Sequence, residues 1–147
     1  MLEGSYSQER NVPYWFWAVA VLATVWNAIG VFDFLMAHLS ADYLAQMSET
    51  QRAYFASFPL WYTVIWASTV LMALASSVAL LFRKHWALTG FAISLGLYVI
   101  SSLYHFGVRE GASVMGPTGM VFSVVIALSL LAFWAFSQRM IRRGILR

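Results

Sequence analysis

Four long apolar runs, separated by short polar or basic segments, dominate the hydrophobic pattern of this chain, and they cover about residues 13–39, 60–82, 86–106 and 118–138. As α-helices rising about 1.5 Å per residue, all four are long enough to cross about 30 Å of hydrocarbon. Residues 64–82 contain no charge and lack the regular polar stripe of a helix in a soluble bundle. The pattern therefore predicts an all-α membrane protein, a single domain (residues 1–147) built as a four-transmembrane-helix bundle.

The segment between the first two runs, residues 40–59, carries its own helix signals. Ser40 can cap a short helix, and the sequence from Ser48 to Gln51 fits a capping box. The apolar side chains that follow these caps fall on one face of each turn: Tyr43, Leu44 and Met47, then Tyr54, Phe55 and Phe58. We expect short amphipathic helices on the outer membrane surface, which act either as a lid over a site or as an ordered connector.

The orientation follows from the lysines and arginines beside the helix ends. With four spans, both termini and the loop after the second run share one side. That side holds seven basic residues, and the other side holds two, Arg52 and Arg109. The seven are Arg10, Arg83, Lys84, Arg139, Arg142, Arg143 and Arg147. Because basic flanks stay inside, both termini are predicted to be cytoplasmic.

Composition supports a membrane protein and excludes some chemistries. Hydrophobic residues make up 61% and charged residues 10%, whereas soluble domains carry about a quarter charged residues. The chain has no cysteine, which excludes disulfides and thiolate sites. The net charge of +3 comes from residues beside helix ends, so it indicates a lipid bilayer as partner and no nucleic acid. The polar start contains Glu3 and Glu9, unlike a secretory signal, so an uncleaved first helix is predicted.

The two halves of the chain share an outline. Residues 31–34 (VFDF) and 103–106 (LYHF) end the first and third runs, and a proline precedes the second and fourth runs, at Pro59 and Pro117. This arrangement fits a parallel internal repeat about an axis along the membrane normal. Convergent membrane-protein composition gives the same outline, and both explanations stay open.

Polar residues near the outer rim are the candidates for a site. Asp33 lies about 30 Å along the first helix, and His105 lies about 29 Å along the third, so both reach a similar depth. His38 and Arg109 are close to that level. Charged groups at such depths usually face protein or a water-filled cavity. The sequence therefore predicts a polar substrate-site cluster of Asp33, His105, Arg109 and His38, or a structural pair that pins Asp33 to His105 or Arg109.

Asn27 lies deeper, near the middle of the bilayer. A buried amide has to find hydrogen-bond partners, and a serine on a neighbouring helix, such as Ser94 or Ser101, is one candidate. The residue is interpreted either as a contact between helices, which is the common case, or as part of the lining of a substrate path.

Motifs for catalysis and cofactors are absent from the sequence. It contains no Walker loop, no G-x-S-x-G and no G-x-G-x-x-G. No pair of histidines has the spacing of a metal site. We therefore expect no catalytic residue, no metal and no cofactor.

The stretch from Pro13 to Asp33, with residues 13–17 (PYWFW), Trp26-Asn27 and Gly30, resembles a group of small four-helix bacterial membrane proteins. Tyr43-Leu44, Tyr54-Phe55 and Phe58-Pro59 extend the likeness. Members are often labelled as sugar transporters, so the resemblance implies a bacterial inner-membrane protein. It implies no particular site residue.

Three functions fit the sequence. The favoured one is a small-solute, sugar-like transporter acting as a homo-oligomer, because four helices rarely enclose a transport path alone. The alternatives are an accessory or scaffold subunit of a larger membrane-protein complex and, less favoured, an intramembrane enzyme using His105 with Asp33. The last would require the two side chains within hydrogen-bond reach.

Overall fold

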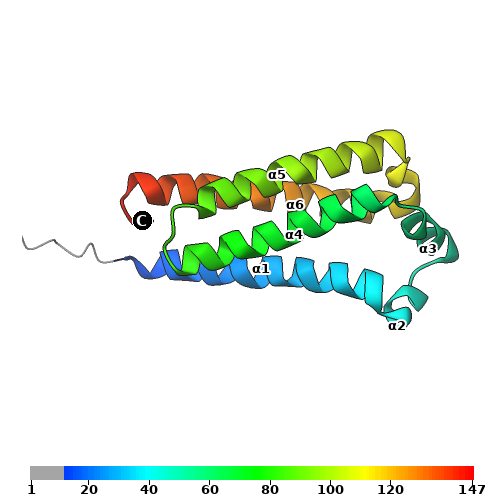
Figure 1. Cartoon of the computed structure of the whole chain (residues 1–147), viewed down its shortest axis with the longest axis horizontal. Helices are drawn as coiled ribbons and strands as arrows, with labels where there is room; N and C mark the ends of the chain where they lie inside the picture. Colours follow the sequence, from blue (N-terminus) through cyan, green and yellow to red (C-terminus); the bar gives the residue numbers. More distant parts are fainter. Residues whose placement is uncertain (1–11) are drawn as a thin grey trace, which may run out of the picture.

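The computed structural model describes residues 12–147, and they form an all-α bundle (Figure 1). Four of its helices are long and apolar enough to cross a membrane, as the sequence predicted. Two short helices lie at one end of the bundle, which we call the α2–α3 end; the opposite end is called the terminal end. The elements are α1 (Tyr14–Leu39), α2 (Ala41–Ala45), α3 (Glu49–Ala56), α4 (Leu60–Leu81), α5 (Ala87–Ser102), η1 (Leu103–Val108) and α6 (Gly111–Arg142). The predictions about Glu3, Glu9 and Arg10 lie outside the described residues.

Prolines and serine caps set the first helix boundaries. Pro13 and Pro59 are the extended N-cap residues of α1 and α4, as expected because proline is tolerated only where a helix begins. Ser40 accepts a hydrogen bond from the backbone N–H of Tyr43, and Ser48 forms a complete capping box with Gln51. The predicted short helices of this loop and their caps are therefore confirmed.

The third and fourth spans depart from regular α-helix. The third continues from α5 into η1, a π-helix, where the predicted run simply ended near residue 106. The fourth was predicted from residue 118, but α6 starts at Gly111 and is interrupted by the non-helical Gly116 (φ 66°, ψ −175°). Pro117 follows directly, so it lies at the start of the long segment and leaves no broken hydrogen bond in its interior. The predicted start therefore corresponds to the restart of the helix after this break.

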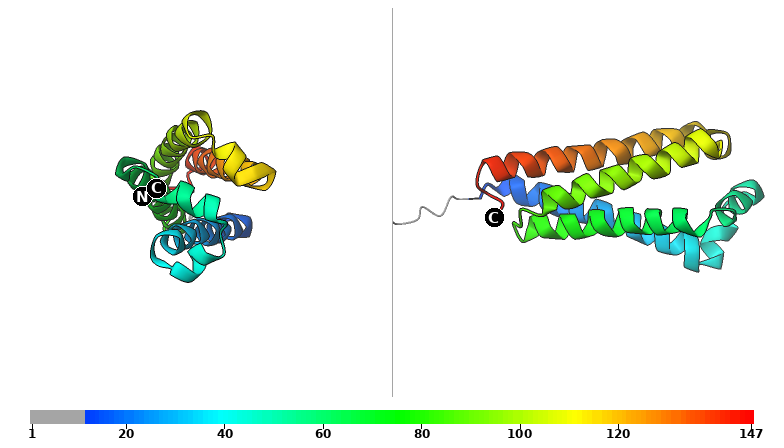
Figure 2. Two further views of the ribbon diagram at one scale, coloured as in Figure 1. Left: turned by 90° about the vertical axis from the view of Figure 1, so that its right-hand side faces the viewer. Right: turned by 45° about the horizontal axis from the view of Figure 1, so that its top comes forward.

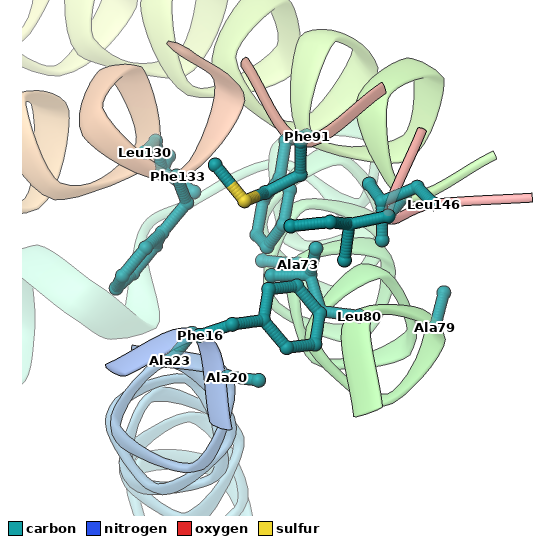
Figure 3. Packing of buried hydrophobic residues seen from close by; sticks show 13 residues of the cluster. Phe16, Ala20, Ala23, Ala73, Ala79, Leu80, Phe91, Leu130, Phe133 and Leu146 are labelled. Carbon is teal, nitrogen blue, oxygen red and sulfur yellow. The ribbon is translucent and has the colours of Figure 1, made fainter. Parts of the chain in front are cut away.

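Helix packing is tight at the terminal end. There α1, α4, α5 and α6 meet around a core that includes Phe16, Leu80 and Phe91, each 0% exposed (Figure 3). Phe16 also stacks on Phe136 of α6, with ring centroids 5.9 Å apart. Toward the α2–α3 end the pair α1–α4 diverges from the pair α5–α6 (Figure 2). The two ends of the bundle are thus built differently.

A tail of residues 143–147 closes the terminal end. Gly144 (φ 68°) ends α6 in a Schellman motif, in which Ile145 N–H bonds Met140 O at 2.9 Å and Gly144 N–H bonds Ile141 O at 2.8 Å. Ile145 and Leu146 are then buried in the core. The backbone of the following Arg147 exchanges hydrogen bonds with the α4–α5 loop. The tail therefore joins the ends of α4 and α6.

The α4–α5 contact depends on small residues. Gly90 on α5 lies directly against Ser76 on α4, and a Cβ added at Gly90 would meet Ser76 Oγ at 2.0 Å. Ser76 and Ser94 are both 0% exposed and bond carbonyls of their own helices. Small residues let helices approach closely where lipid supplies no hydrophobic drive. This contact holds α4 and α5 together in the terminal half of the bundle.

Candidate functional site: a cavity in the α2–α3 half

A cavity of about 310 Å³ occupies the half of the bundle nearer the α2–α3 end. All four long helices line it, and Phe55 of α3 lines it at the loop side. Seven aromatic side chains form much of its wall: Trp26, Phe55, Tyr62, Trp66, Tyr98, Phe106 and Phe122. Its polar lining consists of Asn27, Asp33, Thr69, Ser101, Ser102, His105, Ser123 and Ser129. The volume is at the small end of the range for ligand sites.

Asn27 forms the deep end of the cavity. Its Nδ2 donates to Ser77 Oγ on α4 and to Ala23 O on its own helix, both at 2.8 Å. The sequence suggested Ser94 or Ser101 as partner, and the structure corrects this: Ser77 lies opposite Asn27. Ser94 is buried where α5 faces α4 and bonds Gly90 O, and Ser101 bonds Tyr98 O. Asn27 thus makes the predicted contact between helices, joining α1 to α4, and it also lines the cavity; that the cavity is a substrate path stays a prediction.

Two hydrogen bonds hold α6 in the cavity wall. Trp26 Nε1 donates to Ser129 Oγ at 3.0 Å, which joins α1 to α6. Tyr98 donates its hydroxyl hydrogen to Ser123 O at 2.7 Å, which joins α5 to α6. The phenol and indole hydrogens therefore both have acceptors inside the bundle, where burying an unpaired polar group costs about 2–7 kcal/mol. Their rings stay in the lining.

His105 lies on the π-helix η1 and is 8% exposed. The hydroxyl of Tyr54 on α3 is 3.2 Å from both Nδ1 and the carbonyl oxygen of His105. On its other side the ring meets Gly111, where an added Cβ would lie 2.6 Å from Nε2. A π-helical turn widens the backbone and often occurs at functional sites. Here it delivers His105 to the cavity lining between α3 and the start of α6.

Arg109 fixes α3 across the end of the bundle. Its guanidinium lies 5.5 Å from the Tyr54 ring centroid and 5.7 Å from that of Phe58, and it donates to Ser57 Oγ. Burial raises the pKa of the Tyr54 phenol, and the positive charge of Arg109 offsets part of this rise. The phenol therefore stays protonated at neutral pH and can donate to His105. Tyr54, Phe55 and Phe58 do share one side, as predicted.

Asp33 lies at the mouth of the cavity and is exposed. Its Oδ1 accepts the hydroxyl hydrogen of Tyr43 on α2. This hydrogen bond to the carboxylate is the main cause that raises the pKa of Tyr43 to about 12. The partner of Asp33 is thus a tyrosine of the first loop, whereas the sequence suggested His105 or Arg109. Sequence reasoning missed Tyr43 as a partner because it had assigned that side chain to a membrane-facing surface.

The predicted cluster is brought together only in part. Asp33, His105 and Asn27 line one cavity, while Arg109 and His38 lie outside its lining. His38 bonds Phe34 O of its own helix at 2.8 Å and packs against Trp66, with ring centroids 5.3 Å apart. This geometry provides a cavity with a carboxylate and an imidazole in its wall, each hydrogen-bonded to a different tyrosine.

The aromatic wall is what sequence reasoning missed. Trp26, Trp66 and Tyr98 sit inside the apolar runs and were indistinguishable there from lipid-facing residues. Only the arrangement of the helices turns them inward. Within residues 12–147, no group of three or more His, Asp or Glu side chains is placed to hold a metal ion.

Comparison with known proteins does not assign this chain to a family. No family model, curated protein or solved structure matches this chain. The resemblance to small four-helix bacterial membrane proteins therefore remains an expectation. The four apolar helices identify a multi-pass membrane protein, and the cavity carries the functional argument.

Proposed function

We propose that this protein is a small-solute transporter of the bacterial inner membrane that acts as a homo-oligomer. The observation that carries the proposal is the contrast along the bundle. A cavity with a mixed aromatic and polar lining fills one half, and a closed apolar core fills the other. A carrier that binds its solute from one side needs this combination of an accessible site and a sealed opposite end.

The depth of the cavity supports the same function. Its lining extends from Asp33 at the mouth down to Asn27 and Ala73 on α1 and α4. Substrate sites of many transporters lie near the bilayer midplane. Below Asn27, the side chains of Phe16 and Leu80 leave no exposed surface. The solute would thus be held near the middle of the membrane above a closed gate.

The basic residues support an orientation. The tail and the α4–α5 loop, which carry Arg143, Arg147, Arg83 and Lys84, contact each other at the terminal end. Basic flanks are retained in the cytoplasm. We infer that the terminal end is cytoplasmic and that the cavity opens toward the outside, which makes this state outward-facing.

An oligomer is proposed because one copy offers little room for a second gate. The faces of α1 and α6 that point away from the bundle are apolar and exposed, including Val25, Val121, Val124 and Leu128. Either lipid or a second copy covers them. Two copies placed against each other would supply the additional helices that an alternating path requires.

The test is solute uptake into liposomes with a matched pair of glycine variants. Gly30 lines the cavity, and an added Cβ there would meet its nearest atom, Val70 Cγ1, at 3.9 Å. Gly96 is exposed on α5, and an added Cβ there meets nothing within 4 Å. We expect Gly30→Leu to fill the cavity and abolish uptake, and Gly96→Leu to leave uptake unchanged.

Radiolabelled D-glucose represents the sugar-like solutes, and tetraethylammonium and benzoate represent small cations and anions. Uptake of any of the three above protein-free liposomes, lost in Gly30→Leu and kept in Gly96→Leu, supports the transporter. Uptake at background for all three contradicts it. That result would favour the accessory-subunit alternative, which crosslinking in native membranes then tests through a reproducible heterologous partner.

A further inference from the structure

We propose that the ligand of the cavity is a small organic cation, an ammonium group carrying apolar substituents. Its charge would lie at Asp33 and its apolar part against the aromatic wall. The inference rests on the proposed function, since it names the substrate class of the same cavity. It also departs from the sugar-like solute that the resemblance implies.

The charge of the lining carries the first step. Among residues 12–147, Asp33 is the one carboxylate that lines the cavity, and no lysine or arginine lines it. The nearby Arg109 is engaged elsewhere, over the rings of Tyr54 and Phe58 and on Ser57. Asp33 therefore supplies the carboxylate charge of the lining, while the imidazole of His105 is engaged with Tyr54. A cation compensates that charge, a neutral solute leaves it uncompensated, and an anion is repelled by it.

The carboxylate of Asp33 is oriented and still has a free oxygen. Tyr43 donates to Oδ1, and within residues 12–147 no side chain or backbone group hydrogen-bonds Oδ2. Tyr43 keeps its proton because its pKa is raised to about 12. The hydrogen bond thus positions the carboxylate without neutralising it. One oxygen remains for a ligand that enters from the α2–α3 end.

The aromatic wall supplies the second half of a cation site. Indole and phenyl faces attract ammonium groups, with about 0.5–2 kcal/mol for each well-placed ring. Trp66 lies at the level of Asp33, because it packs edge-on against Phe34, the next residue of α1, with ring centroids 5.2 Å apart. Phe55 reaches the same place from α3, 6.2 Å from Trp66. A carboxylate and several rings therefore surround one entrance.

The rest of the cavity suits apolar substituents. Phe106 and Phe122 line it together with Val70 and Ile126, so an alkyl or aryl group finds contacts there. The hydroxyls of Thr69, Ser101 and Ser129 already donate to carbonyls of their own helices. A polyhydroxylated solute would have to compete with these bonds. The volume, at the small end of the range for ligand sites, favours a small cation.

The test is equilibrium binding of radiolabelled tetraethylammonium to the full chain in phosphatidylcholine nanodiscs. The neutral lipid surface does not itself attract the cation. Asp33→Asn keeps an oxygen that accepts from Tyr43 and removes the charge. We expect it to weaken binding about fivefold, as for loss of one partner of a solvent-exposed charge pair. Glu49→Gln removes an exposed acid of α3 at the same end and is expected to bind like the wild type.

Trp66→Leu is expected to weaken binding about threefold to thirtyfold, and Trp66→Phe to retain most of it. Excess D-glucose and excess benzoate should not compete. Equal binding by Asp33→Asn and the wild type overturns the inference, as does binding of D-glucose or benzoate without tetraethylammonium. Either of these results would contradict the cation but not the transporter, because the cavity could still bind another ligand. Absence of binding for all three probes, together with background uptake, contradicts the transporter as well.

Discussion

The terminal half and the α2–α3 half of the bundle use the same four helices in opposite ways. In the terminal half, Phe16, Leu80 and Phe91 are fully buried, and the tail adds Ile145 and Leu146 to the core. In the α2–α3 half, seven aromatic side chains instead surround a cavity. Aromatic content alone therefore does not determine packing. In the terminal half, small residues such as Gly90 and Ser76 let helices meet directly. In the α2–α3 half, the long side chains of Trp26 and Tyr98 bridge the helices through hydrogen bonds.

The largest test of this contrast removes a phenyl group from each half. Phe16→Ala should lower the free energy of unfolding by about 3 kcal/mol, the lower end of the range for a buried phenylalanine. Lipid surrounds the unfolded helices, so only the lost contacts count. Phe122→Ala should cost clearly less, because Phe122 lines the cavity and is 54% exposed. Unfolding titrations in mixed micelles measure both, and equal losses would contradict the contrast.

The next test concerns the tail. Gly144 has φ 68°, and a side chain in this left-handed region costs about 1–2 kcal/mol. Gly144→Ala should lower stability by that amount and release residues 145–147 to proteolysis. The control is Gly107→Ala, since an added Cβ at Gly107 meets nothing within 4 Å. A tail that stays protected in Gly144→Ala would show that the Schellman motif does not hold it.

A smaller effect is expected where the two halves meet. Asn27 and Ser77 hydrogen-bond across α1 and α4, and both also bond carbonyls of their own helices. Because each keeps that second partner, the coupling energy should be only about 0.6 kcal/mol, typical of polar contacts between membrane helices. A double-mutant cycle of Asn27→Ala and Ser77→Ala measures it. A value of several times this size would make Asn27 a main support of the fold.

The smallest effect is a titration at the mouth of the cavity. Asp33 raises the pKa of Tyr43 to about 12 from its usual 10.0. Folding therefore binds the phenol proton more tightly, and this stabilisation is complete below about pH 10 and lost as the pH rises to about 12. In Asp33→Asn the Tyr43 pKa should fall toward its usual value. Difference absorbance titration against Tyr43→Phe and the matching double variant detects the shift, and an unchanged pKa would exclude the contact.

The four spans could be predicted from the sequence because length and apolarity alone decide whether a segment crosses the membrane. The caps of α2 and α3 were equally local, since Ser48 and Gln51 satisfy each other within one turn. The π-helix at His105 could not be predicted, because the residues that pack on this wider turn, Tyr54 and Gly111, belong to other elements.

The rotation of each helix about its own axis could not be predicted from the sequence either. A run such as residues 60–82 is apolar on all sides, so nothing local indicates that Trp66 faces inward and Val64 outward. The partner of Asn27 was mistaken for the same reason. The depth of a residue in the membrane could be predicted from its position along its helix. This placed Asp33 and His105 at one level, which agrees with their shared cavity. The apolar pair Ile145-Leu146 within a basic tail was the one local signal of a returning segment that went unused.

The returning tail has a mechanical consequence. Arg147 N–H bonds Arg83 O at 2.7 Å, His85 N–H bonds Arg147 O at 2.9 Å, and Arg83 Nε donates to Ile145 O at 3.0 Å. These bonds connect the tail that follows α6 to the end of α4, and so they link the pair α5–α6 to the pair α1–α4. While these bonds are in place, the two pairs can separate only by pivoting about the terminal end. In the proposed transporter, opening the cavity toward the terminal side would therefore require these bonds to break first, and their combined free energy would contribute to the barrier of that movement.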